Sequence, residues 1–149
     1  ADSSPSGEKV DMRRARASGY NIIPTTTGAA DATGEVLPQL KGKFDGTSLR
    51  VPVMTGSIAD ITALVEKNVT EEEINKAFLE AVKEDKYKDV VRATFEPLVS
   101  SDIIGDPYSA IVDLSMTKVI DGNLIKVFAW YDNEWGYSCR LVEMALMMI

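Results

Sequence analysis

The sequence predicts an α+β fold, in which helices pack on one face of a mixed, mostly antiparallel sheet. Several short stretches alternate apolar and polar residues, as strands do, and Asp121-Gly122 joins two of them with a strong hairpin signal. Helical spacing occurs in a few other segments that do not alternate strictly with these strands. With 149 residues, 45% hydrophobic and 26% charged, residues 1–149 are expected to form one domain of an ordinary globular protein.

Composition excludes several kinds of site. The formal net charge of −7 argues against nucleic acid or an anionic membrane as the main partner. The chain has no histidine, so Cys–His pairs, Ser–His pairs and imidazole metal sites cannot form within it, and no metal site is expected. Its single cysteine, Cys139, permits no internal disulfide, which fits a reducing, cytoplasmic location.

The first part of the chain contains two candidate anion-binding features. Residues 1–18 are predicted to be a loop, and they carry Arg13, Arg14 and Arg16, which either form solvated surface or clamp a phosphate or carboxylate. Three threonines and Gly28 then precede a small-residue helix of one or two turns that ends near Pro38 or Gly42. These hydroxyls either cap that helix or, with its positive N-terminal end, bind an anion.

A strand follows the Asp45-Gly46 turn, with Leu49, Val51 and Val53 on one face and Arg50 on the other. An arginine in such a strand is either an edge charge or a ligand that projects into a cleft. Residues 58–65 alternate again and predict a second strand.

The second half of the chain gives the clearest local predictions. Thr70-Glu71-Glu72-Glu73 is a capping box, and the apolar spacing behind it predicts a helix over 70–84. Strands are predicted at 90–95, near Leu98-Val99, at 109–120 and at 124–131. A closing helix is predicted to begin at about Trp135.

Residues 129–138 place both tryptophans and two of the five tyrosines around a polar triplet, Asp132-Asn133-Glu134. One interpretation is that these aromatic rings are core residues. The other is that they hold Asn133 rigidly at the point where a strand passes into a helix, so that its side-chain amide is presented to a ligand.

Taken together, these motifs resemble the C-terminal, catalytic domain of phosphorylating glyceraldehyde-3-phosphate dehydrogenases, and they cover almost the whole chain in family order. The matching stretches are Arg13-Arg14-Ala15-Arg16, Asn21 to Ala30, Leu37 to Lys43, Leu49-Arg50-Val51-Pro52, Pro97 to Asp102, and Trp130 to Ser138. The resemblance implies NAD-dependent oxidation and phosphorylation of glyceraldehyde 3-phosphate, a step of glycolysis, by a tetramer in the cytoplasm. NAD or NADP would be bound by the complete enzyme.

The resemblance also assigns roles to individual residues. It implies that Arg13, Thr27 and Gly28 bind inorganic phosphate, and that Arg50 contacts the phosphate of the substrate. It implies that Asn133 fixes the nicotinamide carboxamide, with Tyr137 near that cofactor site and more often a packing residue. Residues 1–18 would correspond to part of a loop that lines the cofactor pocket of a neighbouring subunit.

Departures from the family pattern limit what this chain is expected to do. The nucleophilic cysteine, its histidine partner and the dinucleotide-binding domain are absent, since no Gly-x-Gly-x-x-Gly follows a strand and Cys139 lies elsewhere. Cys139 is interpreted as a packing thiol. Asp31 occupies a position where lysine is common, and Met54-Thr55 is a variant continuation. The chain alone is therefore expected to be inactive and to bind no cofactor tightly.

Two function classes remain open from the sequence. The chain is either the substrate- and phosphate-binding part of such an enzyme, or a non-catalytic assembly module or stand-alone piece of that domain. In the second case the surfaces that pair subunits in the family would be its main working surface.

Overall fold

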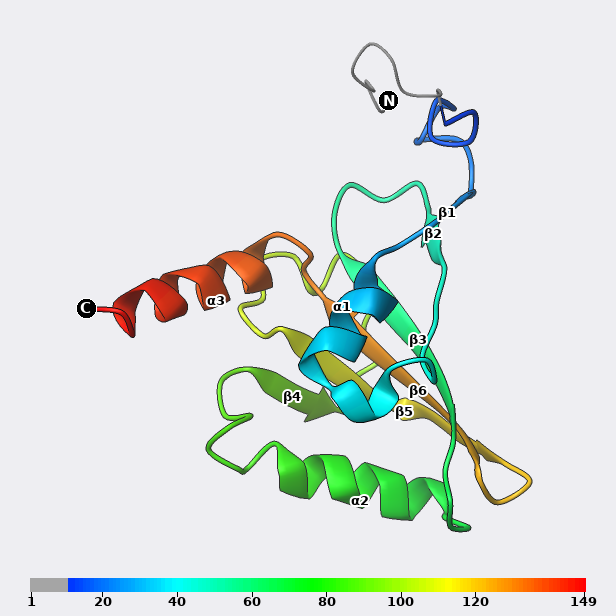
Figure 1. Cartoon of the computed structure of the whole chain (residues 1–149), viewed down its shortest axis with the longest axis vertical. Helices are drawn as coiled ribbons and strands as arrows, with labels where there is room; N and C mark the ends of the chain where they lie inside the picture. The colour runs from blue at the N-terminus through cyan, green and yellow to red at the C-terminus, as the bar shows by residue number, and fades with distance from the viewer. Residues whose placement is uncertain (1–10) are drawn as a thin grey trace. The chain divides into compact units, whose positions relative to one another are not determined.

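The computed structural model describes residues 11–149, and the chain divides into two compact units, Ala1–Val53 and Met54–Ile149. Each unit is described by itself below (Figure 1). Residues 11–18 contain turns and neither helix nor strand, which confirms the loop prediction over this range. The rest of that prediction, residues 1–10, lies outside the described residues.

The first unit contains a two-stranded sheet and a short helix. Its elements are β1 (Ile23–Thr25), α1 (Ala29–Val36), the 3-10 helix η1 (Pro38–Leu40) and β2 (Ser48–Arg50). The predicted helix therefore exists and ends before Pro38. The predicted strand is shorter than expected, because it stops at Arg50, two residues before Pro52, which has no N–H to donate. Strand β1 was not predicted, since three residues give too short a pattern.

The threonine cap of α1 is the first correction. The N-cap residue is Gly28, which makes no side-chain hydrogen bond to the helix. Thr27 accepts a hydrogen bond from the backbone N–H of Ala29 at 3.2 Å, at the edge of the normal range. Helix α1 is therefore preceded by a glycine at its N-cap, and the hydroxyl of Thr27 makes only one long hydrogen bond to its first residue.

The second unit is a four-stranded sheet with two helices. Its elements are β3 (Ser57–Leu64), α2 (Glu71–Ala81), β4 (Val91–Thr94), β5 (Ala110–Ile120), β6 (Leu124–Tyr131) and α3 (Trp135–Leu146). The strand order is β3-β6-β5-β4, with antiparallel pairs except for the parallel pair β4–β5. This arrangement confirms the α+β prediction of a mixed, mostly antiparallel sheet.

One predicted strand is wrong. Leu98-Val99 lies in an irregular segment just before a turn, where the side chain of Asp102 accepts a hydrogen bond from the N–H of Val99 at 2.7 Å. A carboxylate three residues along the chain thus satisfies the backbone group that a strand would have used. An apolar pair of residues is too short a pattern to exclude this alternative.

Two other local signals are confirmed. The hairpin between β5 and β6 turns through residues 121–123, in which Asp121 and Gly122 have φ angles of 52° and 79°, the left-handed backbone that an Asp-Gly pair adopts in hairpin turns. Helix α2 begins with the complete capping box, in which Thr70 and Glu73 each accept a hydrogen bond from the other's backbone N–H.

The core of the second unit lies between α2 and the sheet. Val112, Leu114 and Val127 are buried together, and Ile74 and Phe78 of α2 pack against them. Asn75 fixes the helix further, since its amide donates to the carbonyl of Leu114 at 3.0 Å and accepts from the hydroxyl of Thr117 at 2.7 Å. Helix α2 is thereby held on β5 by packing and by two polar contacts.

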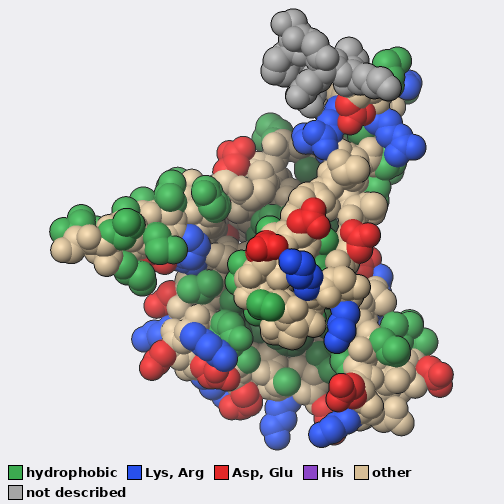
Figure 2. Space-filling view, in the orientation of Figure 1, with side chains coloured by type: hydrophobic (Ala, Val, Ile, Leu, Met, Phe, Trp, Pro, Cys, Tyr) green, Lys and Arg blue, Asp and Glu red, His purple; other side chains and the backbone are tan. Residues whose placement is uncertain are grey.

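Helix α3 begins at Trp135, as predicted, and carries many exposed apolar side chains. Figure 2 shows hydrophobic side chains gathered along it; they include Leu141, Val142, Met144 and Leu146, each 57–66% exposed. No helix within residues 11–149 is long and apolar enough to cross a membrane.

Candidate functional site

An arginine of the N-terminal loop reaches the threonine run in the first unit. The side chain of Arg14 donates from Nε to the hydroxyl of Thr25 at 2.6 Å and from Nη2 to the carbonyl of Thr26 at 3.4 Å. Asp11 fixes the loop from the other end, since it accepts the backbone N–H groups of Arg14 and Arg13 and lies 3.3 Å from Arg14 Nε. Those backbone hydrogen bonds hold the pKa of Asp11 below its ordinary value.

Arg50 lies on the same face of the two-stranded sheet as the contact between Arg14 and Thr25. Strands β1 and β2 pair Ile23 with Arg50 and Thr25 with Ser48. Directly opposed residues of an antiparallel pair project to the same face, and so do residues two apart on one strand. Arg50 therefore projects from the face on which Arg14 meets Thr25, and its side chain is exposed.

Thr27 and Gly28 lie in the three-residue connection, residues 26–28, between β1 and α1. A helix N-terminus carries partial positive charge and unpaired N–H groups, and an added Cβ at Gly28 would have no heavy atom within 4 Å. Asp31 stands in the first turn of α1 and offsets part of that positive charge.

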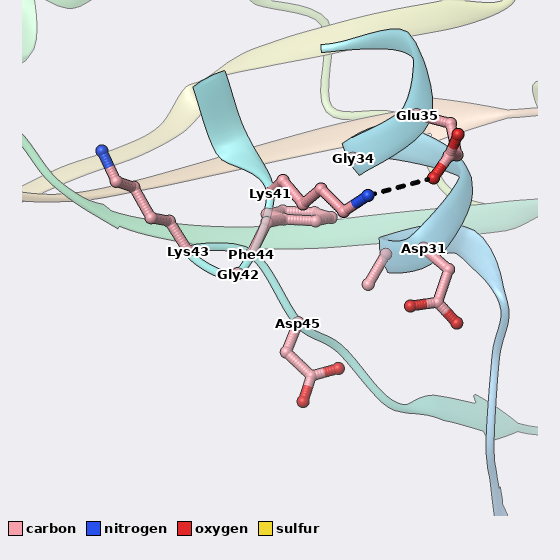
Figure 3. Close-up of a pocket in the computed structure, with 9 residues that line it drawn as sticks. Asp31, Gly34, Glu35, Lys41, Gly42, Lys43, Phe44 and Asp45 are labelled. Atoms are coloured by element: carbon pink, nitrogen blue, oxygen red, sulfur yellow. Dashed lines mark ion pairs between the residues drawn. The ribbon is translucent and has the colours of Figure 1, made fainter. Parts of the chain in front are cut away.

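A charged hollow lies between α1 and residues 41–45 (Figure 3). Its volume is 680 Å³, and its lining includes Asp31, Glu35, Lys41, Lys43 and Asp45. Glu35 and Lys41 form an ion pair of 3.5 Å across it, and both side chains are about three-quarters exposed. Because charges of both signs line this open surface, the lining of the hollow does not select for an anion.

In the second unit, a buried carboxylate shapes the turn that carries Asn133. Asp132 is 5% exposed and accepts three backbone hydrogen bonds of 2.8 Å, from Gly105, Glu134 and Trp135. These donors, with Gly105 contributing most, hold the pKa of Asp132 below its ordinary value. Asp132 thus satisfies the first N–H groups at the start of α3 and ties the turn to another loop.

The side chain of Asn133 is itself held at its oxygen. Asn133 Oδ1 accepts the backbone N–H of Gly56 at 3.0 Å, and the hydroxyls of Thr55 and Ser57 lie 3.4 Å away. The side chain remains exposed to solvent. The structure thus presents the Asn133 amide at the surface, as the second interpretation of the aromatic stretch required.

The aromatic rings contribute less than expected to that arrangement. Trp135 and Tyr137 are 53% and 68% exposed, so neither is a core residue of this unit. Trp130 is partly buried and donates from Nε1 to Asp113 at 3.1 Å. Hydrogen bonds to Asp132 and Asn133, rather than a cage of rings, therefore fix the turn. Cys139 is a half-buried free thiol in α3.

Comparison with known proteins decides the family. Residues 3–133 match the family model described as the C-terminal domain of glyceraldehyde 3-phosphate dehydrogenase. This chain belongs to that family. Glyceraldehyde-3-phosphate dehydrogenase 2 of Streptomyces avermitilis is 54% identical over 138 residues, and the enzyme of Mycobacterium avium is 53% identical over 142. These matches cover 93% and 95% of this chain but 41% of each relative, so the chain spans about two fifths of their length.

Within this glyceraldehyde-3-phosphate dehydrogenase domain, sequence reasoning gave no individual role to three residues that the geometry singles out. Arg14, rather than Arg13, is the arginine whose guanidinium contacts the threonine run. Asp132 and Gly56 hold the turn and the amide of Asn133. An aspartate two to three residues before the free N–H groups of a helix was a usable signal for Asp132. Nothing local pointed to Gly56, which lies 77 residues from Asn133.

Proposed function

We propose that this chain is the substrate- and phosphate-binding part of a glyceraldehyde-3-phosphate dehydrogenase, which oxidises and phosphorylates glyceraldehyde 3-phosphate with NAD as hydride acceptor. The observation that carries the proposal is the polar face of the β1–β2 sheet. It brings Arg14 to Thr25, projects Arg50 from the same side and leads directly into Thr27, Gly28 and the start of α1. The single family model, which spans residues 3–133 and so both compact units, supports assigning them to one substrate domain.

On this proposal, two kinds of phosphate have separate ligands in the first unit. Inorganic phosphate would be bound by Thr27, the N-terminal end of α1 at Gly28, and an arginine of the loop. Arg13 was the sequence-based candidate, and the contact with Thr25 adds Arg14. Arg50 would bind the phosphate of the substrate. Guanidinium groups suit this task because their fork matches two phosphate oxygens at once.

In the second unit, the exposed amide of Asn133 fits a nicotinamide carboxamide. A primary amide offers both a donor and an acceptor, as the carboxamide does. The hydrogen bond from the Gly56 N–H to Asn133 Oδ1, and those that the neighbouring Asp132 accepts, fix its position. Bound NAD would supply the hydride acceptor. The contribution of this chain would be to orient the ring, and Tyr137, one turn along α3, would border that site.

The nucleophile and general base are not among these residues. The sequence contains no histidine, and Cys139 lies half-buried in α3. We therefore expect this chain alone to show no dehydrogenase activity and to bind neither NAD nor NADP tightly. Turnover by the chain that disappears in Cys139→Ser would overturn this part of the proposal. A cytoplasmic location accompanies the proposed glycolytic role.

Two experiments test the assignment. In the first, inorganic phosphate is titrated into the chain while the backbone amide signals of Thr27 and Gly28 are followed by NMR. Shifts that saturate, and that weaken in Arg14→Ala, Arg13→Ala or Arg50→Ala, would support the anion site; unchanged affinity in all three variants would refute it. In the second, the chain replaces the matching part of the Streptomyces avermitilis relative, and the hybrid is assayed for NAD reduction.

A second candidate function is assembly. The apolar side chains exposed on α3 favour it, because patches of this kind commonly pack against another protein surface (Figure 2). Association with further copies, towards the tetramer implied by the family, would bury them. Sedimentation of the chain over a range of concentrations, combined with the phosphate titration, distinguishes the two, since a non-catalytic module would self-associate without binding phosphate.

A further inference from the structure

We propose that Gly56, with the hydroxyls of Thr55 and Ser57, is a positioning element that fixes the carboxamide of Asn133 in one orientation, so that the NH₂ group faces the ligand. The site would then recognise a hydrogen-bond acceptor, the carbonyl oxygen of a ring carboxamide, rather than its NH₂ group. This inference rests on the proposed function for the identity of the ligand. The orientation of Asn133 stands on geometry alone.

The backbone N–H of Gly56 identifies which terminal atom of the Asn133 side-chain amide is the oxygen and which is the nitrogen. A backbone N–H can only donate, so the atom that it faces at 3.0 Å has to be the oxygen of Asn133. The hydroxyls of Thr55 and Ser57, at 3.4 Å, point to the same atom and add weaker contacts. Reversing the amide would place an NH₂ group against the Gly56 N–H, donor against donor, and lose that hydrogen bond; the two hydroxyls can both donate and accept, so the Gly56 N–H is the group that sets the orientation.

The donor in this contact cannot easily move away. Gly56 has a φ of 92°, a conformation that side chains other than glycine rarely adopt. A Cβ at this position would lie 3.1 Å from the buried side chain of Ile103 and 3.1 Å from the carbonyl oxygen of Ser100. Ile103 is completely buried. The direction of the Gly56 N–H is therefore set by a packed loop.

The acceptor residue, Asn133, is held in place through its neighbour in the chain, Asp132. Asp132 precedes Asn133 and is tied to Gly105, which belongs to the same loop as Ser100 and Ile103. One loop thus supports both Gly56 and the turn that carries Asn133. Among the described residues, Nδ2 of Asn133 has no hydrogen-bond partner, while its oxygen has several. The nitrogen is the group left for a ligand.

The consequence concerns which ring substituents the site accepts. If Asn133 donates, a pyridine mononucleotide with a 3-acetyl group keeps the contact, because it retains the carbonyl oxygen and lacks only the NH₂ group. A 3-amino mononucleotide keeps a donor but has no carbonyl oxygen, so it loses the contact. Loss of one such hydrogen bond weakens binding by about tenfold.

The first test uses the unaltered 149-residue chain without ligand. A scalar coupling measured by NMR across the hydrogen bond, from the Gly56 amide nitrogen to Cγ of Asn133, is expected. Slow exchange of the Gly56 amide proton with solvent is expected as well. Absence of the coupling together with rapid exchange would overturn the orientation. This measurement needs no substitution at Gly56, where an added Cβ would disturb folding by itself.

The second test titrates nicotinamide mononucleotide and its 3-acetyl and 3-amino analogues into the same chain, following the side-chain NH₂ signals of Asn133. Similar affinities for the nicotinamide and 3-acetyl compounds, with about tenfold weaker binding of the 3-amino compound, support the inference. The reverse order would refute it. If the coupling is present but none of the three binds, the nicotinamide assignment fails and the orientation of Asn133 stands.

Discussion

Asp132 accepts a hydrogen bond from the backbone N–H of Gly105, 27 residues away in the sequence, at 2.8 Å. The same carboxylate accepts the N–H groups of Glu134 and Trp135 at the start of α3. One buried charge thus joins a loop, a strand end and a helix start around Asn133. The position of Asn133, the residue proposed to bind the cofactor, consequently depends on Asp132, which would not itself contact the cofactor.

Asp132→Asn is expected to destabilise the second unit by about 1–3 kcal/mol, since neutral acceptors bind backbone N–H groups less strongly than a carboxylate and the substituted NH₂ group cannot accept at all. Urea unfolding followed by tryptophan fluorescence measures the change. Asp85→Asn is a matched control, because Asp85 is exposed and has no hydrogen bond or ion pair within the described part of the chain. Equal stability of the two variants would contradict the role given to Asp132.

The same carboxylate predicts a dependence of stability on pH. The folded-state pKa of Asp132 is lowered from its ordinary value of 3.8. The contribution of Asp132 to the free energy of unfolding is therefore complete above about pH 5. It is lost as the pH falls through 3.8, the ordinary value, towards the lower pKa of the folded state. Unfolding free energies measured between pH 6 and pH 3, roughly spanning that range, should fall less steeply in Asp132→Asn. A parallel fall would show that other groups control acid unfolding.

Gly136→Ala is expected to destabilise α3, although alanine normally favours a helix by about 1 kcal/mol over glycine. The added Cβ would lie 2.9 Å from the carbonyl oxygen of Tyr108, closer than such atoms approach, so the helix or the backbone beneath it has to shift. Thermal unfolding of the variant would show a lower midpoint. Gly19→Ala serves as the control because nothing lies within 4 Å of its added Cβ. A raised midpoint in Gly136→Ala would rule out the close contact.

Asn75→Ala should cost about 1–3 kcal/mol, because it leaves the buried hydroxyl of Thr117 and the carbonyl of Leu114 without their partner. Hydrogen exchange of the β5 amides, together with urea unfolding, would measure it. Asn75→Ala combined with Thr117→Val should recover part of the loss, since the second change removes the hydroxyl left unpaired. If the double variant is as unstable as the sum of two independent losses, the two side chains are not coupled.

Arg14→Lys is expected to weaken phosphate binding by about tenfold or more, although the charge is kept, because lysine cannot bridge Thr25 and Thr26 with a planar fork. Isothermal titration with inorganic phosphate measures the affinity. Arg16→Lys is the matched change in the same loop and should alter the affinity little. If both variants bind phosphate as the unchanged chain does, the face of the β1–β2 sheet that carries Arg14, Thr25 and Arg50 is not the anion site.

The local elements with complete signals could be predicted from residues close together in the chain. The capping box of α2, the Asp121-Gly122 turn and the alternation of β5 and β6 each contain their own physical cause. The strand at Leu98-Val99 was predicted wrongly because the nearby carboxylate of Asp102 accepts the backbone N–H of Val99. The threonine cap was predicted wrongly because the N-cap residue is Gly28, which has no side chain to accept a hydrogen bond. Three-residue strands such as β1 lie below what a period of two can indicate.

For the candidate sites, the sequence by itself determined which side chains are available: arginines without histidine, a threonine run, and one asparagine in an aromatic stretch. Tertiary structure alone decided that Arg14 meets Thr25, that β1 places Arg50 on the same face, and that Gly56 fixes the amide of Asn133. These contacts join residues 11 to 77 positions apart. Their geometry follows from strand pairing and a packed loop, which composition and local spacing do not encode.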